Sequence, residues 1–180
     1  IDAAIMFCDL RGSTLLEETL PRDKYINLLN RFFETTSGLV HENGGEVLKF
    51  IGDAVLAVFP AGQNPAEARA QALAAARAIV AALAEITPCP SLPNLDCTIG
   101  IASGSVLYGN IGSQERLDFT VIGQAANIAA RLGDYGKTIG HRIVVSRDIL
   151  TETAEAKPLG HVKLHNVSQP VESFAIAASL

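Results

Sequence analysis

The chain has 180 residues, which suits a single domain, and 48% of them are hydrophobic, so it can bury a sizeable core. Charged residues make up 18% of the chain and the formal net charge is −5. This balance argues against disorder, and against nucleic-acid binding, which needs a basic face. The three cysteines form an odd set without zinc-site spacing, which argues against a disulfide framework and favours a reducing, cytoplasmic setting.

The most apolar long segment, residues 66–86, contains four charged residues, so it is not expected to span a membrane. The chain begins with Ile1, already inside an apolar run. We therefore expect residues 1–180 to be one domain, cut from a longer protein whose other domains would be regulatory.

The first predicted element is a buried strand, because residues 3–8 form a short apolar run that ends at Asp9. Thr14 and Glu17 have the spacing of a capping box, which predicts a helix start. A second helix is predicted to begin at Pro21, because the apolar residues that follow it recur with a period close to 3.6.

The second helix is expected to stop at Asn43-Gly44-Gly45. Two apolar runs, residues 46–51 and 54–59, flank Gly52-Asp53, which predicts a hairpin with a two-residue turn. The rest of the chain predicts an alanine-rich helix, two strand segments, a helix and two further strand segments, at residues 66–86, 95–108, 117–122, 124–132, 143–145 and 162–176. This order predicts an α+β, ferredoxin-like sandwich with a mainly antiparallel sheet and its helices on one face.

Two aspartates are expected to meet at one end of this sheet. Asp9 ends the first strand, Asp53 occupies the hairpin turn, and a ferredoxin-like order brings these segments together. Two carboxylates that close repel each other, so a hard cation such as Mg²⁺ or Mn²⁺ would suit the site. Gly12 allows close backbone approach, and the helix start after it can hold phosphate oxygens. Taken singly, each motif is equally consistent with an ordinary strand end or turn.

A second set of polar residues lies on the helix predicted at residues 124–132. Asn127 and Arg131 are four apart and therefore share one face of that helix. An amide beside a guanidinium suits phosphate and sugar hydroxyls, although a solvated helix face would show the same pattern.

Taken together, the segments FCDLRGST, KFIGD, DFTVIG and NIAAR resemble the catalytic domain of class III adenylyl and guanylyl cyclases. They occur in the order and spacing of that family, and the resemblance extends from Ile5 to Phe174. The resemblance implies a ferredoxin-like cyclase fold that uses two divalent metal ions, Mg²⁺ or Mn²⁺.

The resemblance also implies a role for each matching residue. Asp9 and Asp53 match the metal-binding aspartates. Lys49 and Thr120 match the residues that read the base, Asn127 the residue that orients the ribose, and Arg131 the residue that stabilises the transition state. The backbone of Gly12, Ser13 and Thr14 would hold the terminal phosphates.

The choice between adenine and guanine can be argued from the hydrogen-bonding groups of the two bases. Lys49 offers only donors, which suits N1 of adenine and opposes the N1–H of guanine, and guanylyl cyclases of this family carry a glutamate there. Thr120 can accept from the adenine amino group but could serve either base. A threonine at this position resembles the subgroup stimulated by bicarbonate, so a bicarbonate response is a further hypothesis.

The spacing of Lys49 and Asp53 indicates a dimer. Four residues of extended chain span about 13 Å, so one chain cannot easily read the base and hold the phosphates of the same nucleotide. The family pairs two domains head to tail. Asp9 and Asp53 would come from one chain of a homodimer, and Lys49, Thr120, Asn127 and Arg131 from the other.

The sequence therefore predicts an adenylyl cyclase that converts ATP to cyclic AMP and pyrophosphate at two equivalent shared sites. Three alternatives stay open: a guanylyl cyclase, a catalytically inactive nucleotide-binding regulatory module, and a nucleotidyl-transfer enzyme of the polymerase-palm or diguanylate-cyclase kind. Residues 170–174 lack the lysine with which some animal cyclases bind the terminal phosphate, although Lys163 is nearby in the sequence. Arg116 or Arg11 is the substitute contact considered.

Overall fold

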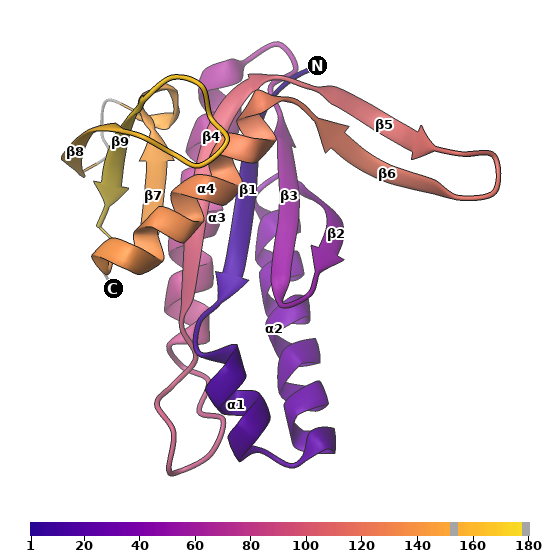
Figure 1. Ribbon diagram of the computed structural model, residues 1–180, viewed down its shortest axis with the longest axis vertical. Helices are drawn as coiled ribbons and strands as arrows, with labels where there is room; N and C mark the ends of the chain where they lie inside the picture. Colours follow the sequence, from indigo (N-terminus) through magenta and orange to yellow (C-terminus); the bar gives the residue numbers. More distant parts are fainter. Residues whose placement is uncertain (152–154, 178–180) are drawn as a thin grey trace.

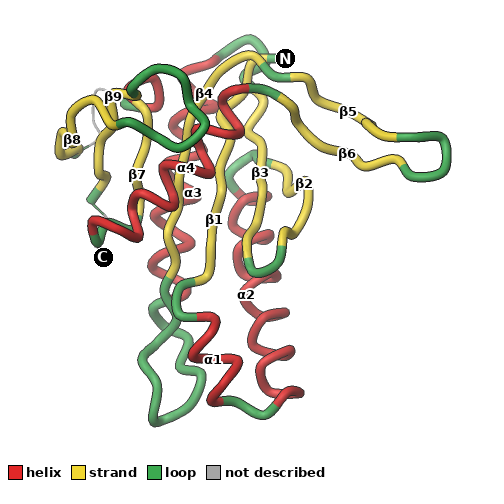
Figure 2. Tube along the Cα trace, in the orientation of Figure 1, coloured by secondary structure: helices red, strands yellow, loops and turns green. Residues whose placement is uncertain are grey.

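The computed structural model describes residues 1–151 and 155–177, and these form one main sheet with helices packed against it (Figures 1 and 2). Seven strands of the described residues lie in the order β2-β3-β1-β4-β7-β9-β8, and all neighbours are antiparallel except β4 and β7. Their bounds are β1 Asp2–Leu10, β2 Glu46–Ile51, β3 Ala54–Pro60, β4 Cys97–Ser105, β7 Ile143–Ser146, β8 Ala156–Val162 and β9 Val171–Ile176. The order β2-β3-β1-β4 is that of a ferredoxin-like sheet, so the predicted α+β fold class is confirmed.

The helices cover both faces of the sheet, and the prediction that they share one face is wrong. They are α1 Ser13–Thr19, α2 Arg22–Glu42, α3 Pro65–Leu83 and α4 Gln124–Ile139, with a short 3₁₀ turn at Arg147–Ile149. On β1, Met6 and Cys8 pack into the core formed with α2 and α3, whereas Ile5 packs into a second core that includes α4. Successive strand residues point to opposite faces, and the central strands are apolar on both, so each face needs a helical cover.

Helix α4 lies directly on β4 because Gly100 has no side chain. A Cβ placed on Gly100 would come within 1.9 Å of the Ala129 carbonyl oxygen and 2.5 Å of the Gly133 nitrogen. This contact fixes the height of α4 above the sheet. The helix also continues to Ile139, beyond the predicted end at Leu132, although Gly133 and Gly136 are poor helix formers.

Strands β5 (Leu107–Gly112) and β6 (Leu117–Ile122) form a separate two-stranded arm that projects from the body (Figure 1). The arm exposes large apolar side chains: Leu107 is 68% and Leu117 61% accessible. At its base the Tyr108 hydroxyl donates to a Glu46 carboxylate oxygen on β2 at 2.5 Å. This bond raises the pKa of Tyr108 to about 12, and burial adds to the effect.

The hairpin turn at Gly52-Asp53 and the end of α2 at Asn43 agree with the sequence. The capping box does not: α1 begins at Ser13, and its N-cap is Gly12, in the left-handed conformation with φ 68°, without a side-chain cap. A glycine is favoured there because other residues pay a steric cost at positive φ.

Of the three cysteines, all within the described residues, Cys8 and Cys97 are buried, Cys89 lies in the connection between α3 and β4, and none forms a disulfide. None of the helices in the described residues is long and apolar enough to cross a membrane.

Candidate active site

The two predicted metal-binding aspartates lie together at one end of the sheet. Asp9 is near the end of β1, and the Leu10 backbone N–H that follows it donates to the Asp53 carbonyl oxygen at 3.1 Å, which ties β1 to the β2–β3 turn. A pocket of about 270 Å³ opens here. Its lining residues are Asp9, Leu10, Arg11, Gly12, Ser13, Thr14, Asp53 and Lys137. The structure thus brings both aspartates and the Gly12–Thr14 segment to one place, as the sequence predicted.

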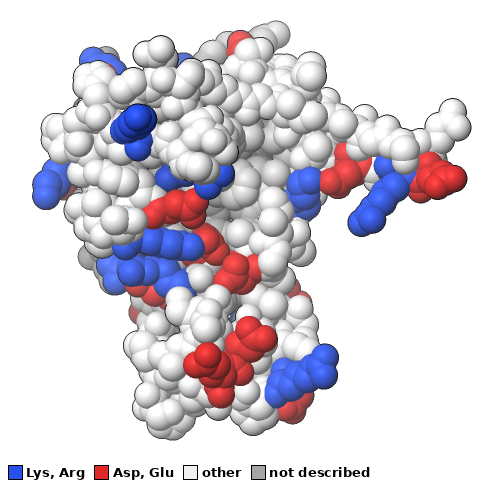
Figure 3. Space-filling model, viewed as in Figure 1, with Lys and Arg blue, Asp and Glu red and all other residues white. Residues whose placement is uncertain are grey.

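The charge balance of this pocket favours a bound cation. Burial raises the pKa of the Asp9 carboxyl, the nearby Asp53 charge raises it further, and Lys137 opposes both by donating a hydrogen bond to Asp9 Oδ2. Acidic and basic side chains accordingly alternate on the face between α4 and α1 (Figure 3). An ammonium group beside two carboxylates shows that the pocket already accommodates positive charge.

Within the described residues, no cluster of three or more His, Cys, Asp and Glu side chains is arranged to hold a metal ion. Two carboxylates alone leave most positions around a Mg²⁺ ion unfilled, and such ions commonly complete their shell with water and substrate phosphates. The pair therefore fits a metal that arrives with a phosphorylated substrate rather than a permanently caged one.

The turn that follows Asp9 can approach a ligand closely. Gly12 adopts its positive φ with no atom within 4 Å of the position where a Cβ would stand, so the space above the backbone is open. Helix α1 starts at Ser13, and the first N–H groups of a helix have no partner within it. Ser13 and Thr14 line the pocket, and their backbone N–H groups have no partner within the helix.

The base-reading candidates lie on other elements. Lys49 is on β2, and its ammonium group donates to Asp118 Oδ2 on β6 at 2.5 Å, which joins the arm to the edge of the main sheet. Thr120 lies two residues further along β6 and therefore on the same face of that strand as Asp118. The sequence analysis included Asp118 in the DFTVIG segment but gave it no role.

Asn127 and Arg131 both lie on α4, as predicted. The Asn127 amide donates to the Asn166 carbonyl oxygen at 3.2 Å, and Arg131 Nη1 lies 3.5 Å from Asp134 Oδ2 one turn on. Within the described part of the chain, Arg131 Nε is buried and has no hydrogen-bond partner. Neither residue, nor Lys49 or Thr120, lines the pocket of the two aspartates. The structure gathers the candidates into separate groups on one chain.

The two arginines considered as phosphate contacts have different positions. Arg11 lines the aspartate pocket and lies 3.8 Å from the carboxylate of Asp96, which also accepts from Arg142 at 2.7 Å. Arg116 lies in the turn at the tip of the arm and does not line the pocket. The pocket also contains Lys137, which was not predicted from the sequence; the helix was expected to end at Leu132, before this residue.

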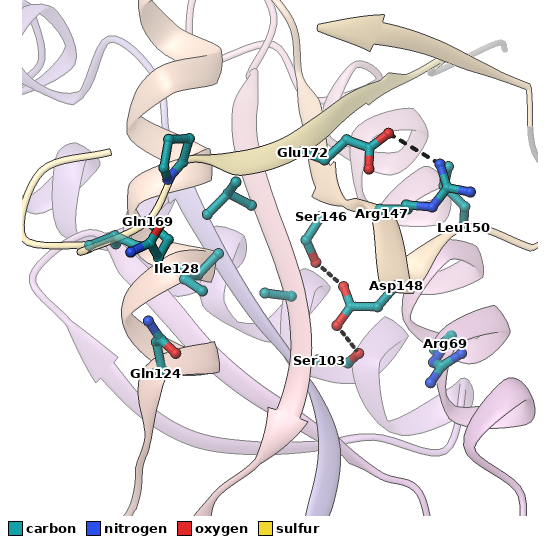
Figure 4. Close-up of a pocket in the computed structure, with 14 residues that line it drawn as sticks. Arg69, Ser103, Gln124, Ile128, Ser146, Arg147, Asp148, Leu150, Gln169 and Glu172 are labelled. Carbon is teal, nitrogen blue, oxygen red and sulfur yellow. Dashed lines mark hydrogen bonds and ion pairs between the residues drawn. The ribbon is translucent and has the colours of Figure 1, made fainter. Parts of the chain in front are cut away.

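A larger pocket, of about 590 Å³, lies near the start of α4 and is lined by none of the predicted site residues (Figure 4). Several of its polar groups bind one another: Asp148 accepts hydrogen bonds from Ser103 and Ser146, and Arg147 pairs with Glu172 at 3.1 Å. The two carboxylates in this pocket are thus already paired, whereas the smaller pocket brings Asp9 and Asp53 together.

The fold matches that of known nucleotide cyclases. Residues 2–176 match the family model of the adenylate and guanylate cyclase catalytic domain, and the chain belongs to that family. Among solved structures, it is similar to a bacterial light-regulated adenylyl cyclase, with a TM-score of 0.84 and 28% identity, over 99% of this chain and 52% of that one.

Two further structures are similar over almost their whole length. The adenylyl cyclase CyaB from P. aeruginosa has a TM-score of 0.85 and 25% identity, over 99% of this chain and 95% of that one. The guanylyl cyclase Cya2 has a TM-score of 0.84 and 27% identity, over 98% and 92%.

Related sequences occur in mycobacteria. The chain is 37% identical over 175 residues to the uncharacterized protein MT1361 of Mycobacterium tuberculosis (strain CDC 1551 / Oshkosh), covering 94% of this chain and 30% of that protein. It is 40% identical over 152 residues to the uncharacterized protein Rv1320c of the H37Rv strain, covering 84% and 26%. The chain thus spans less than a third of the length of these relatives.

Proposed function

We propose that this chain is the catalytic domain of an adenylyl cyclase, which converts ATP to cyclic AMP and pyrophosphate as a homodimer. The observation that carries the proposal is the division of the candidate residues on a single chain. A pocket with Asp9 and Asp53 suits a metal-bound triphosphate, whereas Lys49, Asn127 and Arg131 lie outside it. A second copy, placed head to tail, would supply the missing half of each site.

The choice of ATP rests on Lys49. The similar structures include both adenylyl and guanylyl cyclases, so membership of the family does not decide the base. Asp118 accepts one donor of the Lys49 ammonium group and leaves others available. A fixed donor favours the unprotonated N1 of adenine and opposes the N1–H of guanine, while Thr120 can accept from the adenine amino group.

Asp9 and Asp53 would hold two divalent ions, Mg²⁺ or Mn²⁺, together with the triphosphate. Bound there, such ions would lower the pKa of the ribose 3′-hydroxyl and neutralise the phosphates during in-line attack on the α-phosphorus. The backbone at Gly12, Ser13 and Thr14 would receive the terminal phosphates.

The partner chain would orient the nucleotide and stabilise the charge that develops in the reaction. Asn127 would hold the ribose. Within the described residues, Arg131 Nε is buried without a hydrogen-bond partner, so one donor of its guanidinium group is unsatisfied before a nucleotide binds. Donors aimed at developing charge are worth about a hundredfold or more in rate. We further infer a cytoplasmic catalytic domain that is controlled by other parts of a longer protein.

The first test measures cyclic nucleotide formed from ATP and from GTP, each with Mg²⁺ and with Mn²⁺, at several protein concentrations. We expect cyclic AMP from ATP, with a rate that rises more steeply than linearly with protein because the sites are shared. Cyclic GMP from GTP alone would replace the proposal with a guanylyl cyclase. Nucleotide binding without any cyclic product would identify a regulatory module.

Shared sites make a complementation test possible. Asp53→Ala removes a metal ligand, and Arg131→Ala removes the transition-state donor, so each variant alone should be inactive or nearly so. A mixture of the two forms heterodimers in which one site of the two is intact, and about a quarter of the wild-type activity should return. If the mixture stays as inactive as its components, each site is built from one chain and the head-to-tail arrangement is wrong.

A further inference from the structure

Lys137 occupies an unassigned place in the candidate active site. It lies in the last turn of α4, and its ammonium group donates to Asp9 Oδ2, across the pocket that also contains Asp53 and the Gly12–Thr14 segment. Residues 9 and 137 are far apart in the sequence, so this contact exists only because α4 packs along β1 and β4.

Helix stability alone does not account for this position. A cation in the last turn of a helix interacts favourably with the helix dipole, but it does so equally well when it points into solvent. The Lys137 side chain is instead turned toward the pocket and only 38% exposed, beside an aspartate whose side chain is 25% exposed. The contact therefore belongs to the pocket rather than to the helix end.

The pocket needs a monovalent cation only while it lacks divalent ones. Asp9 and Asp53 line the same pocket and carry like charges, and the ion pair of Lys137 with Asp9 offsets their repulsion. A divalent ion on Asp9 would take over this task and repel the ammonium group. Lysine carries its charge on a flexible four-carbon stem with three donors, so the group can turn to an anion within the same pocket.

We propose that Lys137 is a phosphate-binding residue, which releases Asp9 when a divalent ion binds and then donates to the terminal phosphates of the nucleotide. The inference rests on the proposed function in so far as the substrate is a nucleoside triphosphate. It adds a candidate to those that the sequence left, Arg116 and Arg11. Arg116 lies at the tip of the arm, whereas Arg11 lines the same pocket as Lys137 but lies beside Asp96 rather than Asp9.

If Lys137 changes its partner from Asp9 to phosphate, it has opposite effects on metal binding and on triphosphate binding. These opposite effects distinguish the proposed role from that of a structural ion pair. In the free protein it competes with the metal for Asp9, so its removal should strengthen metal binding. In the loaded protein it binds phosphate, so its removal should weaken triphosphate binding. A purely structural contact would weaken both or neither.

The test measures Mn²⁺ binding to the chain without nucleotide, and then binding of inorganic tripolyphosphate at saturating Mn²⁺, both by calorimetry. For Lys137→Gln we expect Mn²⁺ to bind several-fold more tightly and tripolyphosphate about tenfold more weakly, the scale of one charge-assisted hydrogen bond. Lys137→Arg keeps the charge and should stay near wild type in both. Lys157→Gln, an exposed lysine on β8, controls for the loss of one positive charge.

Unchanged or weaker Mn²⁺ binding by Lys137→Gln, or unchanged tripolyphosphate binding, would overturn the proposal. The result is independent of the base and of turnover, since neither probe contains a nucleoside. If the wild-type chain makes cyclic GMP or no cyclic product, the proposed function fails while the two calorimetric results still decide the role of Lys137.

Discussion

The contact with Asp118 ties Lys49, the residue proposed to read the base, to an aspartate in the arm. The two side chains meet at 2.5 Å and are 30% and 57% exposed, so water screens their attraction. The value of the contact lies in orientation, because a lysine held on one side presents its remaining donors in a limited set of directions. Asp118 is thus a positioning residue for Lys49.

Replacing Asp118 with Asn keeps the shape of the side chain and removes its charge. We expect KM for ATP to rise about threefold to tenfold with kcat little changed, since a binding contact outside the reacting atoms is weakened. Discrimination against GTP should fall in parallel. Steady-state kinetics with both nucleotides measure this. Asp23→Asn, at an exposed aspartate in the first turn of α2, should leave every constant unchanged. An unaltered KM in Asp118→Asn would show that Lys49 needs no positioning partner.

For single residues, the sequence predicted a role where a local structural signal marks the residue, and missed the role where it depends on contacts between distant elements. Asp9 and Asp53 were recognisable because each follows a clear structural signal, a strand end and a two-residue turn. Lys137 and Asp118 carry no such signal. One is a lysine near a helix end and the other an aspartate in a strand, and only the packing of distant elements gives each of them its partner.

Among the elements, the hairpin of β2 and β3 was predicted well because its signal is local. Helix α4 was predicted too short, since Gly133 and Gly136 weaken helix propensity. Close packing explains both glycines: a Cβ on Gly136 would lie 2.7 Å from the His141 carbonyl oxygen, and Gly133 lies against Gly100. Strand β8 was not expected, because Pro158 and Gly160 interrupt its pattern at a register shift.

The contact of α4 with β4 can be tested through Gly100. In Gly100→Ala the new methyl group would collide with the backbone of α4, not with a movable side chain, so the helix must shift. We expect a loss of about 1–3 kcal/mol or more in the free energy of unfolding, together with reduced activity, because α4 carries Asn127 and Arg131. Urea unfolding followed by circular dichroism measures the loss.

A matched control is available on α2. Gly38 lies within that helix, is exposed, and has no atom within 4 Å of its Cβ position. Gly38→Ala should stabilise the chain by about 0.4–1 kcal/mol, since alanine restricts the unfolded chain and favours helix. Equal unfolding midpoints for the two variants would show that the close approach of α4 to β4 is not required.

At the scale of the whole molecule, the arm formed by β5 and β6 stands out because packing within one chain leaves its apolar side chains uncovered. Four of its apolar side chains stay exposed, at 68% for Leu107, 61% for Leu117, 50% for Ile122 and 38% for Phe119. Two contacts join the arm to β2: Tyr108 of the arm donates to Glu46, and Asp118 of the arm accepts from Lys49. The arm is joined to the body, yet its apolar side chains are exposed. This is the kind of surface that a second copy of the chain would bury in the proposed homodimer.

Substituting Leu117 tests this role. Leu117→Glu places a charge where the partner would bury an apolar group, and it should weaken association about tenfold to a hundredfold, the scale of one lost leucine contact. Sedimentation equilibrium measures this, and the circular dichroism spectrum should not change. Leu117→Met retains the apolar surface and should associate normally. If Leu117→Glu dimerises as tightly as the wild type, the arm lies outside the interface.

The burial of two of the three cysteines gives the chain a built-in chemical reporter. Cys8 and Cys97 have no accessible surface, and the pKa of the Cys8 thiol is raised well above its usual value by its hydrogen bond to Cys97 and by burial. Cys89 is accessible, and a hydrogen bond with Ser91 lowers its pKa. A maleimide dye should therefore label the folded chain at a single position, in the connection between α3 and β4, which does not line the pocket of the two aspartates. The appearance of further labelled positions would mark unfolding.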